Sequence, residues 1–200
     1  SKYVGSEPID ESELPELPSV RRERYVRDLL LPPYDASVLT SHKGIADFFE
    51  AVVRAGAPPK RASNWTMTEV LRVSRTDGLK AKIPVRPDAL ARLIARIEEG
   101  AISGAAAKEI FVDLQKGVDA LVVDRIIADR GLAQVSDVGA IEAATRAVVD
   151  GNPREAEAYR GGKDKLLGFF VGQVMRKMGG RASPAVVNEV VKRLLDQTKS

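Results

Sequence analysis

The chain contains no cysteine and only one histidine, His42, among its 200 residues. Without cysteine it can form neither a disulfide nor a thiolate metal site, which fits a reducing compartment. With one histidine, neither a histidine-based zinc site nor a Ser-His-Asp triad is expected. No apolar run approaches the roughly 20 residues of a membrane-spanning helix, and no signal-peptide pattern is present. We therefore expect a cytoplasmic protein with no membrane partner.

Charge is distributed unevenly along the chain. The formal net charge is +3, yet from Arg160 onward nine basic residues accompany only three acidic ones. A basic end on a body of slight negative charge indicates a polyanionic partner for that end. The same composition is also typical of a solvated, lysine-rich surface, so charge alone does not decide between the two.

Prolines and glycines divide the sequence into short amphipathic segments with the three- and four-residue spacing of helices. No segment alternates with period two for long enough to predict a strand, and residues 80–86 are interpreted as a basic, proline-marked link. The predicted fold is all-α, with two small helical domains in tandem at residues 14–131 and 132–200, after a flexible lead-in at residues 1–13. The predicted helices cover residues 20–30, 35–56, 58–77, 87–99, 103–116, 119–130, 136–150, 152–160, 163–178 and 183–195.

The most informative stretch is GGKDKLLGFFVGQVMRKMGGR, residues 161–181. Its apolar residues recur at helical steps and predict one buried stripe: Leu167, Phe170, Val171, Val174, Met175 and Met178. On the other face two glycines lie between two cations, in the order Lys165, Gly168, Gly172 and Arg176. Glycine inside a helix costs roughly 1 kcal/mol relative to alanine, so two of them require a reason. Either another helix packs closely there, or a bulky polyanion lies across the strip.

Several ordered motifs resemble the C-terminal half of GatB, the B subunit of aspartyl/glutamyl-tRNA amidotransferase. They are NWTMTEVLR (64–72), IEEGAISGAAAKEIF (97–111), GLAQVSD (131–137), NPREAEAYRGGKDKLLGFFVGQVMRK (152–177) and ASPAVVNEVVKRLL (182–195). The resemblance covers about residues 14–200. It implies a helical domain followed by the tail, or YqeY-like, domain.

The resemblance also implies a function and partners. In that family the holoenzyme converts mischarged Glu-tRNA(Gln) and Asp-tRNA(Asn) to Gln-tRNA(Gln) and Asn-tRNA(Asn), with ATP and glutamine. The missing N-terminal cradle domain binds ATP and magnesium, so we expect no cofactor, no metal and no catalytic residue in this part. The helical and tail domains would bind tRNA, while GatA and GatC would be the other subunits of this ligase of protein biosynthesis.

The residues expected to bind tRNA combine positive charge with close backbone approach, because RNA corners expose phosphates and sugar hydroxyls. They are Lys163, Lys165, Gly168, Gly172, Arg176, Lys177 and Arg181. The N-terminal end of the predicted helix 163–178 is a further place for a phosphate. The alternative function is a helical protein-interaction module that docks a partner helix on the Gly168/Gly172 face.

Other candidates favour structural roles. Glu98 and Glu99 lie at a predicted helix end and are not expected to be catalytic, and residues 100–104 (GAISG) are interpreted as a tight turn. Trp65 and the pair Phe48–Phe49 are expected in the core. Four arginines of the first predicted helix are either a solvated face or a second phosphate contact: Arg21, Arg22, Arg24 and Arg27.

Overall fold

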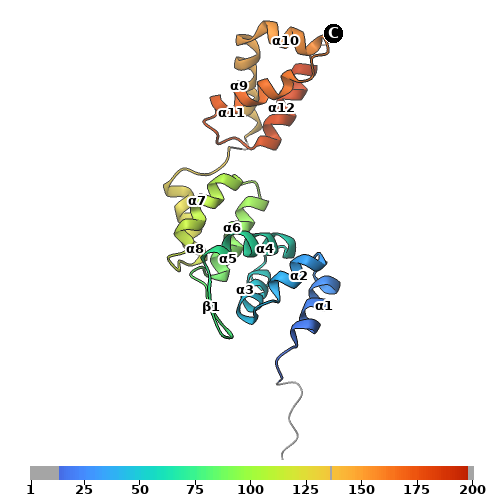
Figure 1. The fold of residues 1–200 in the computed structure, drawn as a ribbon. Coiled ribbons are helices and arrows are strands. Elements are labelled where there is room, and N and C mark those ends of the chain that lie inside the picture. The colour runs from blue at the N-terminus through green and yellow to red at the C-terminus, as the bar shows by residue number, and fades with distance from the viewer. Residues whose placement is uncertain (1–13, 136, 198–200) are drawn as a thin grey trace, which may run out of the picture. The chain divides into compact units, whose positions relative to one another are not determined.

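A computed structural model describes residues 14–135 and 137–197, so the expected lead-in at residues 1–13 lies outside the described part (Figure 1). The chain divides into two compact units, Ser1–Pro87 and Asp88–Ser200. Helices build both units, which confirms the all-α prediction. The division falls at the start of α6, and the predicted boundary between residues 131 and 132 lies inside the second unit. That boundary stays a prediction.

The first unit begins with helices that prolines open: Pro18 opens α1, Pro33 opens α2 and Pro59 opens α4. The sequence predicts a proline start only for the third of these, and α1 and α2 each begin two residues before the predicted positions 20 and 35. Proline suits the first helical turn because its missing N–H has no partner there. The helices are α1 (Pro18–Asp28), α2 (Pro33–Leu39), α3 (Lys43–Arg54), α4 (Pro59–Trp65), η2 (Thr66–Val70) and α5 (Leu71–Val73). Two helices therefore replace the one predicted over residues 35–56, and the break lies at residues 40–42.

The core of the first unit forms around Tyr25 and Phe49, both fully buried, whose ring centroids lie 5.1 Å apart. The Tyr25 hydroxyl donates to the Ala46 carbonyl at 3.3 Å, which satisfies the polar tip of a buried ring. Phe48 is also buried, whereas Trp65 is only half-buried. The core assignment of the two phenylalanines is thus confirmed.

A hairpin replaces two sequence predictions, the end of the helix 58–77 and the link 80–86. Its strands are β1 (Arg75–Asp77) and β2 (Lys80–Lys82), paired antiparallel. The turn between them has two residues, and the first, Gly78, has φ +57°. A glycine with positive φ at this position is typical of two-residue hairpin turns. The helical run therefore ends at Val73, and one turn of it, η2, is a π-helix.

The second unit begins with α6 (Pro87–Glu98), α7 (Gly104–Leu114) and α8 (Ala120–Asp129). Side chains start α7 and α8 as predicted: the Ser103 hydroxyl accepts from the Ala106 N–H at 3.1 Å, and Asp119 accepts from Leu121 and Val122. Residues 100–104 form the predicted turn, because Gly100 has φ +72° and Ser103 caps α7.

The remaining helices are α9 (Val138–Gly151), α10 (Pro153–Arg160), α11 (Leu166–Lys177) and α12 (Pro184–Asp196), which enclose a shared core (Figure 1). Asp137 caps α9 by accepting from Gly139 N–H at 2.9 Å; residue 136, where the predicted helix begins, lies outside the described residues. The segment before α9 is hydrogen-bonded on two sides. Gln134 N–H donates to Ala101 at 2.6 Å, and Val135 pairs with Ala182 in an isolated parallel bridge.

Candidate nucleic-acid interface

Helix α11 carries the candidate site, and glycines define its C-terminal end. Gly179 N–H donates to Arg176 and Gly180 N–H to Met175, at 3.0 and 2.9 Å. Both glycines have positive φ, +66° and +72°. These paired bonds are the Schellman arrangement that ends a helix, as the sequence predicts. At the other end the helix begins at Leu166, three residues later than predicted.

The predicted apolar stripe of α11 faces the core. Phe170 and Val174 are fully buried, and the other stripe residues are half-buried against the same cluster. Phe169, which the predicted stripe does not include, meets the Phe170 ring edge-on, with centroids 5.3 Å apart. The stripe fixes the rotation of α11 about its axis and so decides which residues face solvent.

The glycines on the opposite face are open to solvent. No heavy atom lies within 4 Å of a Cβ built on Gly168 or on Gly172. Within residues 14–135 and 137–197, no other helix packs closely against these glycines. Helix–helix packing inside this part of the chain therefore does not explain them. Lys165 and Arg176 lie on the same side, because steps of three and four residues return to one helix face. We call Lys165, Gly168, Gly172 and Arg176 the glycine strip.

The predicted cations are all exposed, and none of them forms an ion pair within the described ranges: Lys163, Lys165, Arg176, Lys177 and Arg181. Two other arginines of this basic segment are engaged. Arg193 pairs with Glu142, and Arg160 Nε donates to the Leu195 carbonyl at 3.2 Å. Lys192 of the last helix is exposed and unpaired as well, so the cations that the sequence assigns to tRNA are among those that the described part of this segment leaves unpaired.

The structure does not bring all of the predicted residues onto one face. Lys177 lies nine residues from Gly168, about half a turn round the helix. Arg181 follows the helix, and its guanidinium lies against Gly131, since a Cβ built there would be 3.6 Å from Nη1. Lys163 belongs to the turn before α11. The glycine strip is therefore the compact part of the predicted site, with the other three cations around it.

Two of the N–H groups at the N-terminal end of α11 are already engaged. Leu166 N–H already donates to the Lys163 carbonyl, and Leu167 N–H donates to Asp164, both at 3.1 Å. No side chain caps this end. The expectation of a phosphate at this helix end stays a prediction, with two of the donors used by the irregular turn over residues 163–165.

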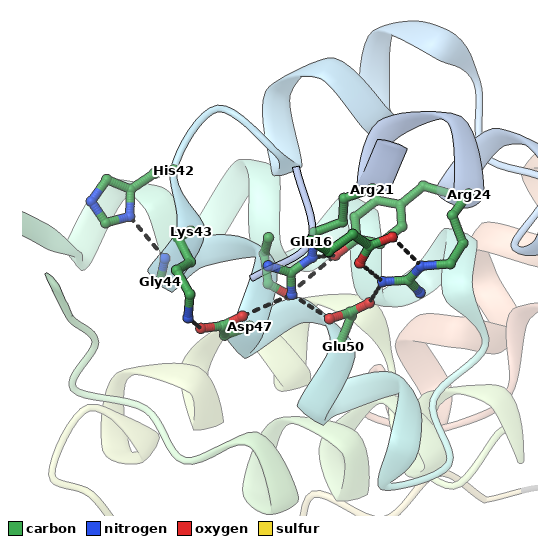
Figure 2. Close-up of polar contacts among 10 residues, drawn as sticks. Glu16, Arg21, Arg24, His42, Lys43, Gly44, Asp47 and Glu50 are labelled. Atoms are coloured by element: carbon green, nitrogen blue, oxygen red, sulfur yellow. Dashed lines mark hydrogen bonds and ion pairs between the residues drawn. The ribbon is translucent and has the colours of Figure 1, made fainter. Parts of the chain in front are cut away.

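The arginines of α1 differ from those of the tail, because carboxylates hold most of them (Figure 2). Arg21 is buried and contacts Asp47 at 2.8 Å and Glu50, while Arg24 contacts Glu50 and, at 2.8 Å, Glu16. Despite partial burial, the hydrogen bond from Lys43 and that from Arg21 lower the pKa of Asp47.

Two outcomes follow for the four arginines that the sequence left open. Arg21 and Arg24 connect α1 to α3 and to the segment before α1 by ion pairs, so they are neither a solvated face nor phosphate contacts. Arg27 pairs with the adjacent Asp28 at 2.7 Å, and Arg22 is exposed. The two alternatives remain for Arg22 and for Arg27, whose side chain is 72% exposed.

His42 has a structural role at the start of α3 (Figure 2). Its Nδ1 accepts from the Gly44 N–H at 3.0 Å, and its Nε2 lies 2.9 Å from the Gly78 carbonyl. The imidazole therefore carries its proton on Nε2 and joins the helix to the hairpin turn.

In the parts of the chain that are described, no cluster of three or more acidic or histidine side chains could hold a metal ion. No described helix is long and apolar enough to cross a membrane.

Comparison with known proteins agrees with the resemblance. Residues 47–195 match the GatB domain family, GatB_Yqey. The chain belongs to the GatB family. The B subunit of the aspartyl/glutamyl-tRNA(Asn/Gln) amidotransferase of Solidesulfovibrio magneticus is 47% identical over 186 residues, 92% of this chain and 38% of that protein. Its counterpart in Pelodictyon phaeoclathratiforme is 48% identical over 196 residues, 96% of this chain and 41% of that protein.

The GatB match covers the whole candidate site. All seven predicted residues, from Lys163 to Arg181, lie within residues 47–195, whereas α1 and its arginines precede that range. The chain spans about two fifths of the length of these relatives and corresponds to their C-terminal region.

Proposed function

We propose that this chain is the tRNA-binding C-terminal part of the GatB subunit of a tRNA-dependent amidotransferase. In this proposal the holoenzyme amidates mischarged Glu-tRNA(Gln), Asp-tRNA(Asn) or both in the cytoplasm, together with GatA and GatC. ATP and magnesium act in the part of the GatB subunit that precedes this region. The present part positions the tRNA and contributes no catalytic residue.

The observation that carries the proposal is the glycine strip with its unpaired cations. A phosphodiester backbone is bulky and negatively charged, so it needs a surface without protruding side chains and with cations at its edges. Gly168 and Gly172 provide the smooth surface, and Lys165 and Arg176 provide the charge. Elsewhere in the chain, Arg21 and Arg24 show the opposite state, in which neighbouring carboxylates neutralise the arginine.

The alternative is that the open glycine face docks a helix of another protein. Salt separates the two proposals, because phosphate binding releases counterions and weakens steeply as salt rises, whereas a packed apolar contact does not. The test is a gel-shift titration of the chain with tRNA(Gln) and tRNA(Asn) at about 0.05 M and about 0.2 M salt. We expect binding at low salt that weakens at least tenfold at the higher salt. Absence of a shift at low salt would contradict the proposal.

A further inference from the structure

The hairpin formed by β1 and β2 carries a second group of exposed cations, in the first unit. Its register places Arg75 directly opposite Lys82, Thr76 opposite Ala81, and Asp77 opposite Lys80. Because residues in directly opposed pairs share one face, Arg75, Asp77, Lys80 and Lys82 all lie on the same face. Thr76 and Ala81 lie on the other.

Contacts with α3 fix which face is free. Ala81 lies so close to Gly44 of α3 that a Cβ built on the glycine would be 2.5 Å from the Ala81 Cβ. Ala81 therefore faces α3, and the charged face of the hairpin points away from that contact. Arg75, Lys80 and Lys82 are exposed, and Figure 1 shows the hairpin projecting beyond the helices of the first unit.

The hairpin is held in place by two contacts with the start of α3. His42 Nε2 bonds to the Gly78 carbonyl at the turn, and the close contact of Ala81 with Gly44 positions β2. A ligand that binds the charged face consequently meets cations whose backbone is already ordered. The entropy lost on binding is smaller than it would be for a mobile basic loop.

The placement of Arg75 opposite Lys82 is unfavourable without an anion. Like charges directly opposite in a hairpin destabilise it. Within the described chain neither side chain forms an ion pair, and Lys80 forms none with Asp77, the carboxylate that faces it. Three cations against one carboxylate leave this small face with a net positive charge. An anionic ligand would remove the repulsion that the register creates.

We propose that the hairpin is a second RNA-binding element, in which Arg75, Lys80 and Lys82 contact phosphates of the bound tRNA. Lys80 and Lys82 stand two residues apart on one strand, about 7 Å, a spacing comparable to that of successive phosphates along an RNA strand. The charged face has no aromatic residue for base stacking, so the contact reads backbone rather than sequence. This inference rests on the proposed function and adds a contact outside the tail.

Lys82→Glu tests the proposal, because it separates stability from binding. A glutamate opposite Arg75 replaces a repulsive cross-strand pair by an attractive one, so the melting temperature should rise by about 1–3 °C. The same change should weaken tRNA(Gln) binding by about tenfold at low salt. Lys108→Glu, at an exposed position of α7, makes the same charge change elsewhere and should leave tRNA affinity within about twofold.

A triple variant measures the number of phosphate contacts. Arg75→Gln, Lys80→Gln and Lys82→Gln together should lower the slope of log affinity against log salt by about 2.7 units, since each of the three lost contacts lowers it by about 0.9. A tail variant, Lys165→Gln with Arg176→Gln, is measured in parallel on the same chain.

The outcomes distinguish the two proposals. If Lys82→Glu and the triple variant bind tRNA with the affinity and salt slope of the unchanged chain while the tail variant binds weakly, the hairpin proposal is overturned and the proposed function stands. If the hairpin variants bind weakly and the tail variant does not, the hairpin is an RNA contact and the glycine strip is not. If the unchanged chain fails to bind tRNA at low salt, both proposals are overturned.

Discussion

Gly44 of α3 faces Ala81 of β2 so closely that a Cβ built on the glycine would lie 2.5 Å from the alanine Cβ and 2.9 Å from its backbone nitrogen. Gly44→Ala must therefore displace the hairpin backbone, and we expect a loss of about 1–3 kcal/mol in the free energy of unfolding. Gly172→Ala is the matched control, since nothing lies within 4 Å there. It should gain up to about 1 kcal/mol from helix propensity. Urea unfolding measures both, and equal effects of the two changes would contradict the packing described.

The buried Tyr25 makes stability depend on alkaline pH. Burial raises its pKa to about 12, from an ordinary value of 10.0. Because the folded pKa is the higher one, this contribution to stability is complete below about pH 10 and is lost as pH rises toward 12. We expect a loss of about 2 to 3 kcal/mol over that range. The loss should shrink in Tyr25→Phe, measured by urea unfolding at several pH values, and an unchanged pH dependence in that variant would disprove the assignment.

Adjacent arginines of α1 should respond very differently to substitution. Arg21→Met removes one of the two arginines that pair with Glu50, which keeps Arg24, and also removes the contact with Asp47, so we expect it to cost about 1–3 kcal/mol of stability. Arg22→Met changes an exposed side chain and should cost less than about 0.5 kcal/mol. Thermal unfolding compares the two. A similar small effect at both positions would show that the Arg21 ion pairs contribute little.

Gly172→Glu should weaken tRNA binding more than Lys192→Glu does, although the lysine change alters the net charge by twice as much. The glutamate places bulk and negative charge in the middle of the glycine strip, whereas Lys192 is an exposed residue of α12. The melting temperature should not fall, because the position is open and glutamate favours a helix. Gel shift and melting curves on one sample check both statements. Unchanged tRNA affinity would remove this face from the site, and a sharp fall in melting temperature would show that the face is buried in solution.

The chain alone should show no ATPase, glutaminase or amidotransferase activity. The proposal assigns the transamidation chemistry to the part of GatB that this chain lacks. Coupled assays for ADP and for glutamate test the expectation directly. Turnover above background that a point change in this chain abolishes would contradict it.

Sequence reasoning predicts the helices well wherever proline opens a segment and glycine closes it. The start of α10 and the end of α11 illustrate this, since Pro153 and Gly179 act through fixed or permissive backbone angles that do not depend on distant contacts. The solvent exposure of Gly168 and Gly172 follows from the apolar stripe on the other side. These features depend only on residues that are close together in the sequence, so they can be predicted from the sequence alone.

The features that sequence reasoning misjudges depend on partners far along the chain. The ion pairs of Arg21 join residues 26 and 29 positions apart, so a row of arginines alone could not show that carboxylates neutralise it. The hairpin is a different case. Its turn residues are Gly78 and Leu79, a pair with a glycine in the first position, but the strands of three residues are too short for alternation to be visible. From the sequence alone, Lys80 and Lys82 therefore look like residues of the basic link predicted at residues 80–86.

The segment before α9 is attached through its main chain: Gln134 and Val135 use their backbone groups to bond Ala101, Arg181 and Ser183. A bond between peptide groups does not depend on which side chain each residue carries. This attachment can therefore persist while the amino acids at positions 134 and 135 change in the course of evolution. Two relatives that differ at both positions can share the same junction, and sequence variability there is no measure of its structural importance.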